Sequence, residues 1–196
     1  NGGVGDEGQV ILVVHDSNSE TAKERVKSFE EEIKNNYPSV SIVETIYCDK
    51  LDDLKKKIAV EKDPNISEDL QKAAVEKMTD DEVMQHYLKK YPDLKGVFGT
   101  NESSTIFALE ALQKTELAGK VALVGFDISE EQIAAMKNGE ISGLVVQNPF
   151  GMGYASVVAA ARTILQSGNE AVVDTGYIWV TKDNLEDESI QNMLYK

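Results

Sequence analysis

Residues 96–147 read GVFGTNESSTIFALEALQKTELAGKVALVGFDISEEQIAAMKNGEISGLVVQ, and this stretch decides the fold. It alternates three short apolar runs with two longer segments of helical character. The runs are GVFGT (96–100), VALVGF (121–126) and ISGLVVQ (141–147), and the helical segments are residues 104–114 and 129–139, the second closed by Gly139. Short β-branched runs predict buried strands, and strands alternating with helices predict a parallel sheet. We therefore expect an α/β fold with helices on both faces of a Rossmann-like sheet.

The same alternation continues toward the amino terminus. VILVV (10–14) is too short for a helix and predicts the first parallel strand. Residues 21–38 carry apolar side chains at helical spacing and end at a proline, which stops a helix. VSIVETIY (40–47) and residues 49–60 repeat the strand and the helix.

One stretch interrupts this rhythm. Residues 59–78 are highly charged and lie where a single helix would normally return to the sheet, so we expect a surface-facing insertion. Thr79 and Glu82 have the spacing of a capping box, which predicts a new helix from that point. After the apolar run at residues 141–147, residues 152–168 predict a helix, and residues 171–184 predict a strand followed by a turn.

Composition excludes several classes of function. Acidic residues outnumber basic ones 34 to 20, giving a net charge of -14 that would repel nucleic acid and anionic membranes. The single cysteine, Cys48, forms no internal disulfide, and no Cys/His cluster has the spacing of a metal site, so we expect neither metal nor cofactor. The start, NGGVGDEGQV, lacks the pattern of an export signal, which leaves a cytoplasmic protein or a signal outside this sequence.

Polar residues gather where ligands bind in open parallel sheets, just beyond the carboxyl ends of the strands. They are Arg25, Asn101, Asp127 and Gln147. A cation, an anion and two amides suit a neutral polyhydroxylated ligand, because each hydroxyl both donates and accepts a hydrogen bond. None of these groups has to change its protonation state to bind such a ligand.

Each candidate has an alternative structural role. The alternatives are capping of the helix near Ser129 by Asp127, capping of the helix near Ser103 by Asn101, and a surface ion pair between Arg25 and Glu30 or Glu32. Gln147 ends a buried apolar strand, where an amide requires a hydrogen-bond partner.

Aromatic residues are secondary candidates, because a ring can stack on the apolar face of a sugar. Tyr47 is the first of these, and the others are Phe126, Phe150 and Trp179. Trp179 is most simply explained as core or edge packing, and His15, at a strand end, as a hydrogen-bonded loop residue. No nucleophile elbow or phosphate loop occurs, and the glycines of residues 1–8 precede a strand, so we expect no enzyme.

In their order and spacing, GVFGTNESSTIFALEAL, VALVGFDISEEQIAAMKNGEISGLVVQNP and the following MGY resemble the periplasmic sugar-binding proteins of the ribose and galactose type. Effector domains of the lactose-repressor family share that fold. The resemblance implies that Arg25, Asn101, Asp127 and Gln147 bind a monosaccharide, either a pentose or a hexose. It also implies an extracytoplasmic solute-binding component of an ABC importer, periplasmic or lipid-anchored, that presents its sugar to a permease.

The resemblance divides the chain into two parts. Residues 1–147 correspond to the second lobe of the family, with the insertion near 59–78, and residues 148–196 to segments that return to the first lobe. We therefore expect a fragment with half of the site. Its returning helix and strand lack their packing partner, so we expect them to be rearranged, swapped between copies or packed against another chain. The alternative is a sugar-sensing effector domain, either of a lactose-repressor-type regulator or of an extracytoplasmic signalling system.

Overall fold

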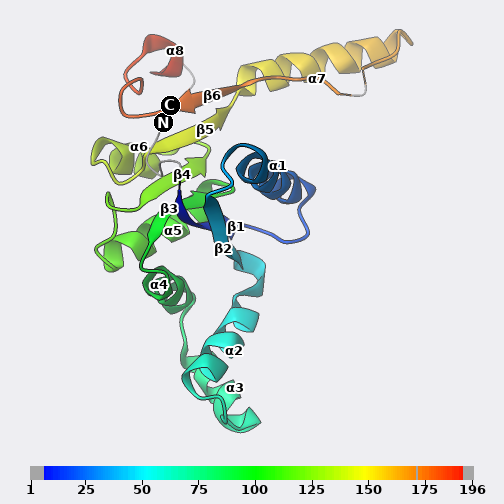
Figure 1. The fold of residues 1–196 in the computed structure, drawn as a ribbon. Coiled ribbons are helices and arrows are strands. Elements are labelled where there is room, and N and C mark those ends of the chain that lie inside the picture. The colour runs from blue at the N-terminus through cyan, green and yellow to red at the C-terminus, as the bar shows by residue number, and fades with distance from the viewer. Residues whose placement is uncertain (1–6, 171, 192–196) are drawn as a thin grey trace.

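The computed structural model describes residues 7–170 and 172–191, which form a six-stranded sheet with the order β2-β1-β3-β4-β5-β6 (Figure 1). The strands are β1 (Gly8–Val14), β2 (Val40–Tyr47), β3 (Leu94–Gly99), β4 (Ala122–Phe126), β5 (Gly143–Gln147) and β6 (Tyr177–Val180). The first five run parallel, and β6 pairs antiparallel with β5. The predicted α/β fold is confirmed.

Helices connect the strands and flank the sheet. They are α1 (Glu20–Asn36), the short 3₁₀ helix η1 (Cys48–Lys50), α2 (Leu51–Lys62), α3 (Glu68–Lys77), α4 (Asp80–Lys90), α5 (Glu102–Lys114), α6 (Glu130–Lys137), α7 (Pro149–Ile164) and α8 (Glu188–Gln191). The predicted capping box is confirmed, because Thr79 and Glu82 each bond the backbone N–H of the other at the start of α4. The predicted stop at Gly139 is confirmed by its φ of 80° just beyond α6.

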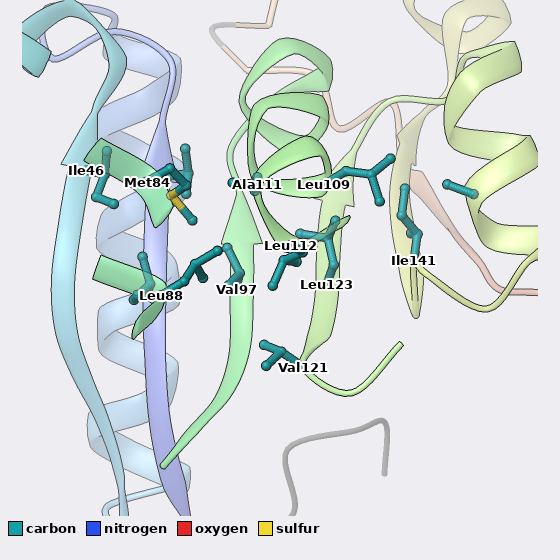
Figure 2. Packing of buried hydrophobic residues seen from close by; sticks show 14 of the residues in the cluster. Ile46, Met84, Leu88, Val97, Leu109, Ala111, Leu112, Val121, Leu123 and Ile141 are labelled. Carbon is teal, nitrogen blue, oxygen red and sulfur yellow. The ribbon is translucent and has the colours of Figure 1, made fainter. Parts of the chain in front are cut away.

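Two hydrophobic cores lie on opposite faces of the sheet, as the strand alternation of β1 requires. Ile11 and Val13 face a large core shared with α2, α4, α5 and α6. Figure 2 shows Val97, Leu112 and Leu123 of this core gathered between α5 and the central strands. Leu12 faces a smaller core that is packed against α1. Helices therefore cover both faces, with α1 alone on one of them among the described helices.

The charged segment at residues 59–78 contains the end of α2 and the whole of α3. Figure 1 shows this pair of helices projecting from one end of the molecule. All ten residues of α3 are described, and none of them is buried. The surface-facing character is therefore confirmed, while the description of the segment as an insertion stays a prediction.

The two segments after β5 behave differently from each other. Helix α7 leaves the sheet and extends outward (Figure 1), and none of its described residues is buried. Strand β6 instead completes the sheet, and its Val180 is fully buried. The expectation that this strand lacks a partner is therefore wrong, because the open edge of β5 offers unpaired backbone groups. The assignment of residues 148–196 to another lobe stays a prediction.

Two sequence-based predictions extend into residues that the structure does not describe. The glycine-rich start at residues 1–6 and the proposed strand start at Ala171 lie outside the described residues. Among the helices of the described ranges, none combines the length and the apolar character that a membrane span requires.

Candidate functional site

Asp127 and Gln147 meet at the carboxyl edge of the sheet, where β4 and β5 end side by side. The side-chain amide of Gln147 donates a hydrogen bond of 3.0 Å from Nε2 to Asp127 Oδ1. The backbone N–H of Asp127 donates to Val145 O at 2.9 Å, and its φ of 63° turns the chain away from the sheet. The capping alternative for Asp127 is wrong, because Ser129 caps α6. Gln147 has the partner that its position required.

Arg25 reaches the same edge from the second turn of α1. Its Nη1 donates a 2.6 Å hydrogen bond to Thr100 O, and its guanidinium carbon lies 3.9 Å from the centre of the Phe126 ring. Burial lowers the pKa of Arg25, and the nearby carboxylate of Asp127 opposes that shift. No salt bridge joins Arg25 to an acid among the described residues, so the expected surface ion pair is absent there. The guanidinium contacts Thr100 and Phe126 instead.

Asn101 lies two residues beyond the end of β3 and fulfils its alternative structural role as the cap of α5. Its Oδ1 accepts a hydrogen bond of 2.9 Å from the Ser104 N–H. The Ser104 hydroxyl accepts one from the Asn101 N–H in return, which completes a capping box. The side-chain oxygen is therefore used by α5. The Nδ2 group of Asn101 donates to no acceptor within the described residues, so it is the part of this amide that a ligand can use.

Two neighbours of the predicted residues were missed by sequence reasoning. Phe126, considered only as a stacking ring, instead supports the guanidinium of Arg25. Thr100, which is fully buried, accepts from Arg25 through its carbonyl and contacts His15 through its hydroxyl. A threonine that ends a strand carries no pattern that would distinguish it from an ordinary β-propensity residue.

The other aromatic candidates take separate positions. Tyr47 ends β2 at the same edge, half-buried against the smaller core, with Lys50 Nζ 5.7 Å from its ring. Phe150 is 82% exposed on α7. Trp179 packs across β5 against Gly143, where an added Cβ would collide with the indole ring. Its interpretation as edge packing is confirmed.

A pocket of about 220 Å³ opens beside the paired carboxylate and amide. It is lined by Asp127, Ile128, Val146, Gln147, Pro149 and Met152. Drug-sized ligands occupy larger sites, of roughly 300–1,000 Å³. The pocket therefore offers one polar wall and several apolar contacts to a small ligand.

The groups at this edge are suited to binding rather than to covalent chemistry. Within the described ranges, no cluster of His, Cys, Asp and Glu residues could hold a metal ion. Burial and the nearby carboxylates of Asp49 and Asp80 raise the pKa of Cys48 to about 11, so its thiol stays protonated at neutral pH. The site thus consists of fixed hydrogen-bond donors and acceptors.

The sequence of this chain matches a family model. The model is that of the periplasmic binding protein domain, and the match extends over residues 2–169.

Curated relatives match over shorter stretches. The ribose import binding protein of Salmonella typhimurium is 36% identical over 84 residues, which are 42% of this chain and 27% of that protein. A xylitol-binding protein of Mycolicibacterium smegmatis is 30% identical over 106 residues, which are 53% of this chain and 30% of that protein. The matched part thus amounts to less than a third of each of these relatives.

Solved structures match over nearly the whole chain. A carbohydrate transporter solute-binding protein of Agrobacterium radiobacter, in complex with D-arabinose, superposes with a TM-score of 0.73 at 26% identity, covering 96% of this chain and 56% of that one. An ABC transporter solute-binding protein of Agrobacterium vitis, with bound D-fucose, gives a TM-score of 0.72 at 26% identity. The match covers 98% of this chain and 57% of that one. The relatives and neighbours named here are sugar-binding or solute-binding proteins and not enzymes. This chain belongs to the periplasmic binding protein family, in its sugar-binding type 1 branch.

Proposed function

We propose that the chain binds a monosaccharide, a pentose or a hexose, at the carboxyl edge of its sheet. The observation that carries this proposal is the arrangement of Gln147, Asp127 and Arg25. The amide holds one carboxylate oxygen of Asp127 and leaves the other available, and Arg25 uses one of its five N–H donors on Thr100. The anionic acceptor lies close enough to the cationic donor to raise its pKa against the effect of burial, and no salt bridge joins them within the described residues.

A sugar hydroxyl satisfies both groups at once. It donates its proton to the carboxylate and accepts from the guanidinium, and each charge-assisted hydrogen bond contributes on the order of 1.5 to 3 kcal/mol. The apolar lining at Pro149 and Met152 suits the C–H groups of the ring. The amides of Asn101 and Gln147 add donors and acceptors for further hydroxyls.

The relatives support transport as the biological setting. Their names describe a ribose import binding protein and a xylitol-binding protein, and the neighbours were solved with D-arabinose and D-fucose. We propose accordingly that the chain is part of the extracytoplasmic solute-binding component of an ABC sugar importer, in the periplasm or on a lipid anchor, and that a permease is its partner. The names of these curated relatives favour import over the sugar-sensing alternative.

We further propose that the sugar binds between two lobes, as the resemblance to the sugar-binding family implies. We propose that residues 1–147 form the second lobe and that residues 148–196 include segments that pack on the first. The exposed apolar side chains of α7 support this arrangement, because Tyr154, Val157 and Ile164 are each at least 67% exposed and require a covering surface. The described part of the chain then holds half of the contacts, so its affinity for sugar by itself is weak.

Calorimetry with a panel of pentoses and hexoses tests this function. For the sugar that binds, Asp127→Asn removes the charge but keeps the shape and the left-handed backbone preference of the residue. We expect the affinity to fall about 30-fold, because roughly 2 kcal/mol of charge-assisted hydrogen bonding is lost. Asp69→Asn, on the exposed helix α3, is the matched control and should bind normally. Equal affinity in both variants would remove Asp127 from the site, and absence of binding to every sugar would contradict the function.

A further inference from the structure

The hydrogen-bond ladder between β1 and β3 ends in an unusual way at Thr100. The backbone N–H of Thr100 donates to Val13 O at 3.0 Å, as a parallel ladder requires. The next bond of such a ladder would run from the His15 N–H to the Thr100 carbonyl. Instead, the His15 N–H donates to Thr100 Oγ1 at 3.2 Å. The hydroxyl has taken the place of the carbonyl.

This replacement releases the Thr100 carbonyl for another donor. The carbonyl accepts the 2.6 Å hydrogen bond from Arg25 Nη1. This bond fixes Arg25 at the carboxyl edge of the sheet. Thr100 is 0% exposed, and water therefore does not compete for either of its oxygen atoms. Thr100 thus fixes the position of the Arg25 side chain relative to the end of β1.

The same hydroxyl also determines the tautomer of His15. Its oxygen lies 2.9 Å from His15 Nδ1 and already accepts the His15 backbone N–H. The hydroxyl has one proton to donate, and within the described residues His15 Nδ1 is the acceptor in reach. A buried hydroxyl proton without an acceptor is unfavourable, so Nδ1 accepts and the imidazole proton resides on Nε2. His15 then has a fixed N–H donor in place of an undefined tautomer.

We propose that Thr100 is a positioning residue for the sugar site and that His15 is an additional ligand contact, donating from Nε2–H to a sugar oxygen. His15 follows β1, whose last residue, Val14, pairs with the candidate Tyr47, and it borders Thr100 on the other side. His15 therefore lies between Tyr47 and Thr100 at the carboxyl edge of the sheet. The ligand contact rests on the proposed function, whereas the hydrogen-bond arrangement at Thr100 does not.

The tautomer is tested without any sugar. The ¹⁵N shifts of the imidazole nitrogens report which one carries the proton, and His86, the other histidine of the chain, serves as an internal reference. We expect the Nε2–H form in the parent chain and in Thr100→Ser, and a mixture of tautomers in Thr100→Val. A fixed Nδ1–H form in the parent, or an unchanged spectrum in Thr100→Val, would overturn the positioning role.

Affinity for the sugar tests the contact itself. We expect Thr100→Val to weaken binding about tenfold or more and Thr100→Ser to restore most of it, because serine keeps the hydroxyl. Thr115→Val is the matched control, since its hydroxyl bonds a helix carbonyl at the far end of α5. His15→Ala should weaken binding several-fold. If His15→Ala binds like the parent while Asp127→Asn does not, the ligand contact is refuted and the proposed function stands.

Discussion

Asp127 adopts a backbone conformation that is uncommon for a residue with a side chain. Its φ of 63° lies in the left-handed region, which aspartate and asparagine tolerate better than most residues. The turn places the carboxylate next to the Gln147 amide while the backbone N–H stays bonded to Val145. Unfavourable backbone conformations of this kind are found preferentially at binding sites. The local geometry of Asp127 therefore agrees with a role in recognition.

Arg25 provides a prediction at the same scale. Its guanidinium bonds Thr100 O while it lies on Phe126, and a lysine ammonium lacks the planar fork that permits both. We expect Arg25→Lys to reduce sugar affinity by at least about tenfold with little change in stability. Titration calorimetry and thermal unfolding measure the two quantities. The control is Arg162→Lys, at the chain's only other arginine, which is exposed on α7. It should leave the affinity and the stability unchanged. Equal affinities in the two variants would refute the role of Arg25.

At the scale of elements, two glycines allow the start of α5 to approach the sheet. A Cβ at Gly99 would lie 2.7 Å from the backbone of Thr105, and one at Gly125 would collide with the Thr105 side chain. Thr105 is fully buried and donates its hydroxyl to Asn101 O at 2.6 Å. The close approach of α5 therefore sets the position of Asn101 at the ligand edge.

Gly99→Ala tests this packing. The added methyl group must displace backbone, so we expect the free energy of unfolding to fall by about 1–3 kcal/mol and the sugar affinity to fall with it. Gly153→Ala is the matched control, because a Cβ there would meet no atom within 4 Å beyond its chain neighbours and the backbone of its own helix. Alanine in place of glycine also stabilises a helix by roughly 0.5–1 kcal/mol. Denaturant unfolding compares the two variants. A Gly99→Ala chain as stable as Gly153→Ala would contradict this explanation of how α5 packs.

The elements could be predicted from sequence wherever local signals agree with the tertiary structure. The strand at VILVV, the capping box at Thr79 and the stop at Gly139 all depend on neighbouring residues, and the structure confirms them. The prediction of a strand followed by a turn over residues 171–184 agrees with β6 at Tyr177–Val180, but its pairing with β5 could not be predicted. Local sequence does not specify which sheet edge a strand joins, because that depends on non-local backbone pairing.

The site could be predicted only in part. The positions of Asp127 and Gln147 follow from strand ends that share one edge of the sheet, and the structure brings them into contact. The stacking of Arg25 on Phe126 and the exchange of ladder bonds at Thr100 could not be predicted, since they depend on how closely α1 and β3 approach. Such contacts join residues that are about 75 or more positions apart, beyond the reach of periodicity.

At the scale of the whole molecule, the sheet and its flanking helices are compact, whereas helix α7 extends away from them. The sheet is packed by two cores on its two faces, whereas α7 carries Phe150 and Ile164 at 82% and 80% exposure. Solved relatives are matched over 56–57% of their length. A compact sheet beside an exposed helix α7 agrees with the proposed function. In that proposal, the carboxyl edge of the sheet and helix α7 both face a second lobe.

The most direct measurement is an NMR titration of the chain with each sugar of the panel, following the side-chain signals of Arg25 Nε–H, Asn101 Nδ2, Gln147 Nε2 and the His15 imidazole. We predict that one pentose or hexose shifts these signals together, along one binding curve, and that signals of exposed α3 stay unchanged. Binding of a sugar that leaves the four side chains unperturbed, or a shift of no signal by any sugar, would contradict the claim that they form one site.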